Sequence, residues 1–343
     1  MRSSALAMLL ALVAAAPLAA APTYKAPRTA SGQPDLQGLW NNATITPLTR
    51  PASFGARNVL TPQEAAALES ATAAQVARAN APTPPELKVG ELKNADCGAD
   101  GISGFNCGYN QGWKDPGAAV IDFNGEKRAS ILVAPANGQF PPMTAEARAR
   151  RPAHGNGASD GPEGRGLGER CILSFGSSAG PPMLPLMYNN TYQIVQTKDA
   201  VLIEVEMVHD TRIVRLNSRH RTDGVRQWMG DSIGWWDGET LVIETTGMRP
   251  EQGLRGGSAN TKVTERLTRI GPGKIHYRFT VEDPGVYAQP FSGEVAFNAT
   301  SGPMYEYACH EGNYAMAGIL AGARAAEQAG GVVAPDGREE GAN

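Results

Sequence analysis

The residues best suited to proton transfer lie together near the C-terminus, in the sequence CHEGNY. Histidine titrates near neutral pH and responds to a neighbouring carboxylate, so His310 and Glu311 predict an acid–base pair. Adjacent residues of a strand point to opposite faces, and the two side chains can therefore cooperate only in a turn or at a helix start. Gly312 and Asn313 favour such a turn. The alternative is a docking segment for a C-terminal helix, in which Cys309 is buried and a carbonyl satisfies His310.

A second candidate centre is a His-Asp-Thr-Arg turn between two predicted strands. In the functional interpretation His209 lies at the mouth of a barrel, and Arg212 faces an anionic or phenolic group of a substrate. The alternative is ordinary turn chemistry. Glu204 and Glu206 lie two residues apart in the preceding strand. Inside a barrel the pair would raise the pKa of one of the two carboxyl groups and act as an acid–base pair; outside it, which we favour, they form a solvated face.

The four cysteines are read as disulfide partners because the chain carries an export signal, described below. Cys97 and Cys107 lie ten positions apart in a loop rich in Gly and Asn, and we expect a local bridge between them. Cys171 and Cys309 then either pair with each other over a long sequence distance or stay free and buried. A zinc site would need ligands at short spacing, and the sequence has no CxxC, HxxxH or HxH, so we predict no metal site.

Arg170 is the third candidate for chemistry. It precedes Cys171, so a bridge to Cys309 would bring it beside the acid–base pair and form a cation-lined pocket. Ligand pockets are mostly apolar with few polar anchors. Four aromatic residues are candidates for the wall of such a pocket, with core packing as the alternative for each: Tyr109, Trp113, Tyr188 and Tyr314.

The first 21 residues have the pattern of a secretory signal peptide. A basic start is followed by an apolar run over 5–16 and by small residues at 18–21. No later segment is apolar enough to span a bilayer. The chain has 31 basic and 34 acidic residues, a net charge of −3, which argues against binding nucleic acid. We therefore expect a periplasmic or secreted protein.

The elements that would position these residues are irregular in the first half of the chain. Gly38-Leu39-Trp40 is typical of a first strand, and Thr61 followed by Pro62 and Glu64 predicts a helix start with a capping box. Asn124-Gly125 is a strong hairpin signal between two extended runs. The remaining predictions here are a helix over 61–78, strands over 118–123 and 128–134, and a short helix over 144–151.

The second half predicts a nearly unbroken antiparallel meander. Strands are expected over 192–196, 201–207, 212–216, 226–230, 240–245, 262–270, 275–281 and 293–297. So many sequential strands would expose unpaired edges unless the sheet closed, so the predicted fold class is mainly β, a meander closed into a barrel with a few short helices.

In Trp235-Trp236 we expect one ring on each face of the sheet. A helix over 316–326 would lie as a lid or plug against the barrel. The predicted organisation is a signal peptide over 1–21, a single barrel domain over 22–326 and a disordered tail over 327–343. Within the barrel domain we distinguish an irregular N-terminal part over 22–168, the meander over 188–298, and the C-terminal motif and helix over 303–326.

Two resemblances emerge from these residues. The Gly-x-Trp of the first strand, followed by a meander, is similar to the lipocalin-like (calycin) barrels. Nearly the whole mature chain also resembles a widespread group of exported bacterial proteins with little assigned function, a resemblance that implies a secreted barrel and no catalytic residues. The stretches that carry it are PDLQG at 34–38, ERC at 169–171, GDS at 230–232, WDG at 236–238, DP at 283–284 and EYACHEGNY at 306–314.

The motifs of several large enzyme classes do not occur. The chain has no phosphate-binding GxxxxGK[ST] and no GxGxxG after a strand, and Ser174-Phe175-Gly176 with its neighbours only superficially suggests a GxSxG elbow, so we expect no nucleotide or other cofactor and no serine nucleophile. The sequence thus predicts a cofactor-independent acid–base enzyme, favouring a lyase that acts on a small aromatic or apolar molecule. Glu311 would be the base, His310 the acid, and Arg170 or Arg212 the anion stabiliser. The alternative is a non-catalytic lipocalin-like carrier of a small hydrophobic ligand.

Overall fold

The computed structural model of the chain describes residues 24–80, 115–150, 161–174, 180–252 and 257–329. The predicted signal peptide, Cys97, Cys107, Tyr109 and Trp113 lie outside the described residues, so the local cysteine bridge and two of the four proposed aromatic wall residues stay predictions.

Nine of the described strands close into a barrel, which confirms the predicted fold class. In spatial order each strand pairs with the next, and the last strand pairs with the first through Trp40 opposite Ala299 and Asn41 opposite Asn298. The short strand β5 (Leu132–Ala134) pairs with the start of β13, antiparallel to it. The barrel strands are β1 (Gly38–Asn41), β6 (Thr191–Gln196), β7 (Ala200–Val205), β8 (Thr211–Leu216), β9 (Asp231–Asp237), β10 (Thr240–Thr246), β11 (Lys262–Gly271), β12 (Lys274–Glu282) and β13 (Phe291–Ala299).

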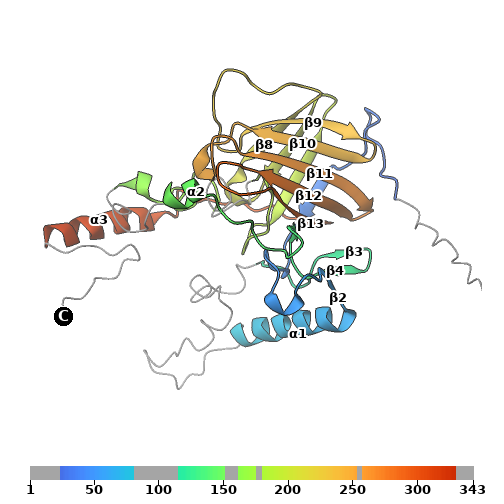
Figure 1. The fold of residues 1–343 in the computed structure, drawn as a ribbon, viewed down its shortest axis with the longest axis horizontal. Helices are drawn as coiled ribbons and strands as arrows, with labels where there is room; N and C mark the ends of the chain where they lie inside the picture. Colours follow the sequence, from blue (N-terminus) through green and yellow to red (C-terminus); the bar gives the residue numbers. More distant parts are fainter. Residues whose placement is uncertain (1–23, 81–114, 151–160, 175–179, 253–256, 330–343) are drawn as a thin grey trace, which may run out of the picture.

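One pair of strands breaks the predicted meander. Strands β8 and β9 are parallel, so the chain must return from the end of one to the start of the other. Residues 217–230 make this crossover and form the long loop at the top of Figure 1. The strand predicted over 226–230 is therefore wrong. In its place Gln227 forms an isolated parallel bridge with Met248, outside the barrel sheet.

Alternating residues of the barrel strands fill the interior with apolar side chains. Strand β12, for example, buries Ile275, Tyr277, Phe279 and Val281, and its intervening residues face outward. Trp235 is 39% exposed, whereas Trp236 packs against the core, as expected for neighbouring residues on opposite faces. The largest fully buried aromatic side chains of the described residues are Trp40, Tyr192, Tyr277, Phe279, Phe291 and Phe297.

Trp40 of β1 is fully buried and is held by two contacts. Its indole Nε1 donates to the carbonyl of Leu36 at 2.9 Å, and the guanidinium of Arg269 lies 5.5 Å from the centre of its rings. Arg269 also donates to the carbonyl of Asp35 at 2.9 Å. The first strand predicted from Gly-Leu-Trp is thus both confirmed and fixed to the lead-in that precedes it.

A small second sheet lies beside the barrel, in the order β2 (Val59–Leu60), β4 (Glu126–Arg128) and β3 (Asp122–Phe123). Helix α1 (Pro62–Ala79) covers it from below in Figure 1 and begins with the predicted Thr61–Glu64 capping box. Asn124 and Gly125 both have positive φ, as the predicted turn requires. The two strands predicted on either side are shorter than expected, because residues after Arg128 bond to loops: Ala129 N donates to Asn58 O, and Ile131 N to Pro47 O.

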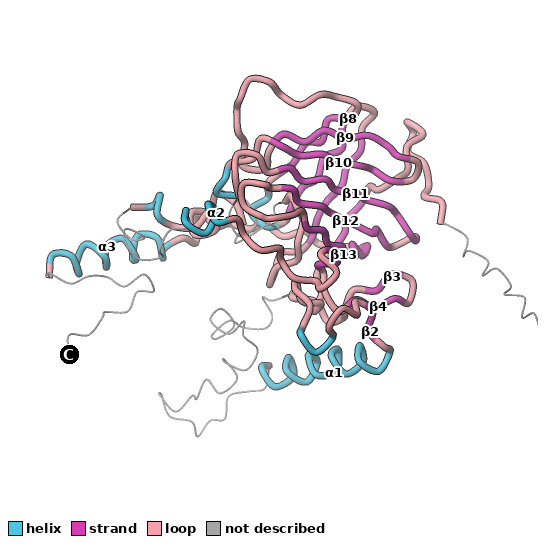
Figure 2. The backbone as a smooth tube through the Cα atoms, in the orientation of Figure 1, coloured by secondary structure: helices cyan, strands magenta, loops and turns pink. Residues whose placement is uncertain are grey.

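Helix α3 (Tyr314–Gln328) extends away from the barrel, so the prediction that it forms a lid or plug is wrong (Figures 1 and 2). Its composition explains this, because most of its residues are Ala or Gly and only Ala323 is fully buried. Among the described residues no helix is long and apolar enough to cross a membrane. The other helical segments are α2 (Ala145–Arg150) and the short 3₁₀ turns η1 (Ala52–Phe54), η3 (Pro162–Gly164), η4 (Met207–His209) and η5 (Pro250–Gln252).

A buried carboxylate joins the small sheet to the outer wall of the barrel. Glu294 on β13 accepts hydrogen bonds from Arg128 of β4 and from His276 of β12, the latter at 2.9 Å. The Phe123 ring also packs on His276 at 4.1 Å between ring centres. Burial alone would raise the pKa of Glu294, but the bonds and charges of His276 and Arg128 outweigh it and lower the pKa to about 2.

This joint predicts an acid-dependent loss of stability. The folded pKa lies below the ordinary value of about 4.3, so the stabilisation is complete above pH ~4.3 and disappears as the pH falls toward 2. We expect Glu294→Gln to lower the free energy of unfolding by about 2 kcal/mol at pH 7 and to flatten its decline below pH ~4.3. Urea denaturation at several pH values measures both. Glu126→Gln, which removes an exposed partner of the same arginine, is the matched control and should cost well under 1 kcal/mol.

Candidate functional site

A charged pair is buried inside the barrel. Arg212 of β8 and Glu265 of β11 both point inward, and their side chains are 2% and 0% exposed. Two guanidinium nitrogens of Arg212 donate to the two carboxylate oxygens of Glu265, Nη2 to Oε1 at 2.9 Å. The Tyr277 hydroxyl of β12 donates to the same Oε1 at 2.9 Å. The anionic and phenolic groups that Arg212 faces therefore belong to the protein itself.

Burial sets the protonation of this network. Burial alone would lower the pKa of Arg212, but the charge and hydrogen bonds of Glu265 raise it, so the guanidinium stays charged. Burial, followed by the charge of Glu265, raises the pKa of Tyr277 well above its ordinary value, and burial likewise raises that of Tyr192. Both phenols are thus neutral hydrogen-bond donors, and the ion pair is electrically balanced.

Residues 180–183 lie against this network. The amide of Met183 donates to the Tyr277 hydroxyl at 2.9 Å, and the carbonyl of Gly180 accepts from Gln252 Nε2 at 2.7 Å. Asn42 Nδ2 donates to the carbonyl of Met183 at 3.4 Å. The four side chains that meet here come from β8, β11, β12 and η5, and each is buried.

The predicted acid–base pair lies elsewhere, beside a disulfide. Cys171 and Cys309 are bonded, which settles the alternative left open by the sequence in favour of pairing. Arg170 and His310 each adjoin one of these cysteines in the sequence. However, His310 and Glu311 are exposed, and within the described residues neither has a hydrogen bond or ion pair from its side chain. Water surrounds these groups, so they lack the enclosed pocket that the sequence predicted.

The surrounding motif is docked by its neighbours. Asn313 donates to the carbonyl of Glu169 at 2.7 Å and caps α3 by accepting from Met316 N. Tyr305 N donates to the buried Glu206 at 2.8 Å, which also accepts from Thr191 N. The segment is thus docked, as in the alternative, but Cys309 is only partly buried and His310 is exposed with no carbonyl partner for its side chain among the described residues, so those two details of the alternative are wrong.

The remaining predicted residues are dispersed. His209 is exposed on η4, with a positive φ of 47°. Tyr188 packs partly buried against the core and stacks on Tyr307 at 6.2 Å, whereas Tyr314 is 84% exposed. Of the sequence-selected residues that the structure describes, only Arg212 lies in the buried network. The sequence analysis missed Glu265, Tyr277 and Gln252. The one available signal was that Glu265 and Tyr277 take the same inward-facing positions as the apolar residues of β11 and β12.

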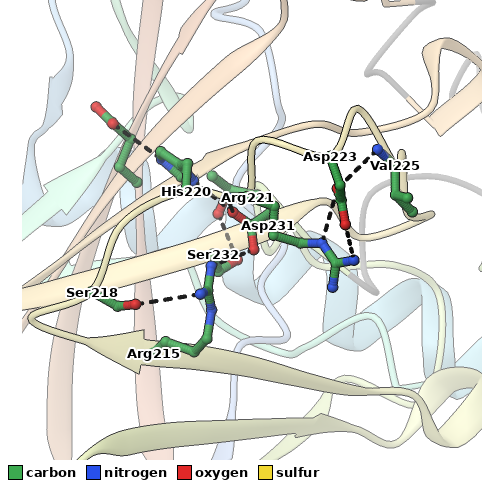
Figure 3. Close-up of polar contacts among 10 residues, drawn as sticks. Arg215, Ser218, His220, Arg221, Asp223, Val225, Asp231 and Ser232 are labelled. Carbon is green, nitrogen blue, oxygen red and sulfur yellow. Dashed lines mark hydrogen bonds and ion pairs between the residues drawn. The ribbon is translucent and has the colours of Figure 1, made fainter.

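A second polar cluster holds the crossover to the outside of the barrel (Figure 3). His220 lies between two carboxylates, with Nδ1 2.9 Å from Asp231 Oδ2 and Nε2 3.2 Å from Glu244 Oε1. Arg215 also donates to Asp231 at 2.6 Å, and the backbone amide of Arg221 donates to it at 2.9 Å. A neutral imidazole carries one N–H, so only the doubly protonated ring donates to both carboxylates. This cluster fastens residues 217–230 to β9 and β10.

Among the described residues, no group of three or more His, Cys, Asp or Glu side chains is arranged to hold a metal ion. Comparison of the chain with known protein families finds no match, and comparison with curated proteins finds none either. The function therefore has to be inferred from the geometry of the buried network, the disulfide-linked segment around His310 and the His220 cluster.

The His220 cluster predicts a local change that leaves the barrel folded. His220→Ala should lower the free energy of unfolding by about 1–2 kcal/mol, because two partly buried charge-assisted contacts are lost. It should also speed hydrogen exchange at the Arg221 amide, which Asp231 accepts. Exchange measured by mass spectrometry and urea denaturation test both effects. The exposed His310→Ala is the matched control and should change neither; equal effects of the two substitutions would contradict this role for His220.

Proposed function

We propose that the chain is an exported, cofactor-independent acid–base enzyme whose chemistry takes place at the buried network of Arg212, Glu265 and Tyr277, with elimination as its reaction class. The observation that carries the proposal is a fully buried ion pair with a neutral phenol bonded to it. Export is supported by the signal-like sequence of residues 1–21.

Each side chain has a role that its contacts support. A carboxylate has about four acceptor sites, and Glu265 uses three of them for Arg212 and Tyr277, so one site on Oε2 is free to take a proton. The raised pKa of Tyr277 keeps the phenol protonated, so a proton is present that a leaving oxygen can take. Arg212 holds both groups in place.

Elimination balances with these groups alone. Glu265 takes the proton from a substrate carbon, the C–H electrons form the new double bond, and the bond to the leaving oxygen breaks as Tyr277 supplies its proton. Return of the proton from Glu265 to Tyr277, which already donates to it, restores the enzyme. The exposed pair of His310 and Glu311 supports this chemistry less well, because desolvation is a main means of tuning a catalytic pKa.

A non-catalytic carrier of a small hydrophobic ligand is the second candidate, and the aromatic side chains that face inward favour it. The buried network among those side chains, however, offers a ligand polar partners, namely the ion pair of Arg212 and Glu265 with the Tyr277 hydroxyl, and a purely apolar ligand would satisfy none of them.

The experiment that separates the candidates is proton exchange in D₂O. A panel of small β-hydroxy carbonyl compounds is incubated with the protein, and loss of the proton at the carbon next to the carbonyl is followed by ¹H NMR. Tyr277→Phe should lower the elimination rate by about 10²-fold or more. The exposed Tyr305→Phe is the matched control and should keep full rate.

Arg212→Gln alone would leave Glu265 as a buried charge without its partner and could unfold the protein. The double variant Arg212→Met/Glu265→Met removes both charges, and it should fold and lack activity. If Tyr277→Phe keeps full rate and His310→Ala or Glu311→Gln abolishes it, the chemistry belongs to the disulfide-linked segment and the proposal is overturned. Binding of a panel compound without exchange supports the carrier.

A further inference from the structure

The main chain of residues 180–183 occupies the buried network as a bound neutral ligand would. Two of its carbonyls accept from side-chain amides, those of Gln252 and Asn42, and one of its amides donates to the Tyr277 hydroxyl. None of these contacts involves a charge on residues 180–183. The network therefore recognises uncharged hydrogen-bonding groups.

Three polar atoms of this network have no hydrogen-bond partner among the described residues. They are Arg212 Nε, Gln252 Oε1 and Asn42 Oδ1. The three residues are 3%, 5% and 0% exposed. A buried polar group without a partner costs on the order of 1–3 kcal/mol, so native proteins rarely retain several at one place unless something else satisfies them.

The unpaired atoms are of two kinds. Arg212 Nε–H is a donor and needs an acceptor, whereas the two amide oxygens are acceptors and need donors. Gly180 links the first two residues, since its carbonyl bonds Gln252 and a β-carbon built on it would lie 3.6 Å from Arg212 Nη2. A hydroxyl group both accepts and donates, so hydroxyl groups suit both kinds of unpaired atom.

Charge decides between the possible ligands. Glu265 already balances the charge of Arg212, so a carboxylate ligand would bring an uncompensated negative charge into a buried site. A neutral molecule with several hydroxyl groups meets all three unpaired atoms without that cost.

We infer that the network around Arg212, Gln252 and Asn42 is a binding site for a neutral polyhydroxylated molecule, a sugar or a related polyol. The inference rests on the proposed function and names its substrate class. The hydroxyl that replaces the missing partner of Arg212 Nε fixes the substrate beside Tyr277 and Glu265.

The test observes the guanidinium directly and does not depend on turnover. The full chain is labelled with ¹⁵N-arginine, and the Arg212 Nε–H signal is assigned by its loss in Arg212→Met/Glu265→Met. Glycerol, D-glucose and acetate are then titrated separately. We expect the two polyols to shift this signal saturably and acetate to leave it unchanged at equal concentration and ionic strength.

Variants on η5 locate the contact. Gln252→Met removes one unpaired acceptor and should weaken polyol binding about tenfold, whereas Glu251→Gln, exposed on the same turn, should not change it. Circular dichroism confirms that both variants fold; should Gln252→Met not fold, Asn42→Leu replaces it, with the same expected loss.

Two outcomes overturn the inference. A shift caused by acetate instead of the polyols would make the site an anion site. A signal that no probe shifts, together with a magnetisation-exchange contact to a long-lived water, would mean that Arg212 Nε binds water only. Either result leaves the Tyr277→Phe measurement intact, because that assay depends on proton exchange and not on the Nε–H contact.

Discussion

Closure of the sheet between β1 and β13 is the constraint on which the rest of this structure depends. Once nine strands close, every second residue loses contact with water, and a charged residue at an inward position must find its partner inside. Arg212 and Glu265 are such residues, from strands three positions apart in the sheet. Their pairing is therefore a consequence of closure, and so is the neutral state of the phenol bonded to them.

Two segments outside the barrel are fixed to its wall by specific contacts. The crossover over 217–230 is held by His220 between two carboxylates, and its Gln227 pairs with the stretch around Met248 that leads into Gln252. The C-terminal motif is tied down by a disulfide and by the bond from Tyr305 to Glu206. Both ties fix segments that would otherwise be free to leave the wall, and neither contributes a side chain to the buried network.

Local signals were readable from the sequence, and long-range ones were not. The Gly-Leu-Trp strand, the capping box at Thr61 and the Asn124-Gly125 turn depend on neighbouring residues, and all three are confirmed. The parallel pairing of β8 and β9 was missed because turn signals favour antiparallel neighbours. Glu265 and Tyr277 contact Arg212 only after the barrel closes, so their spacing along the chain does not predict that they form one network. Conversely, CHEGNY gathers reactive residue types in one short run, yet its histidine and glutamate face water.

This contrast bears on where chemistry is possible. An exposed histidine beside a glutamate gains little from its neighbour, because water screens the charges and hydrates both groups. Inside the barrel the same kinds of groups interact far more strongly, and each is held by two or three hydrogen bonds. In the proposed binding site the balanced ion pair also sets selectivity, since it removes the attraction that a lone buried guanidinium would exert on anions. The unpaired groups of the proposed site are then the Nε–H of an arginine whose charge is balanced and two neutral amide oxygens, which favour ligands by hydrogen-bond pattern more than by charge.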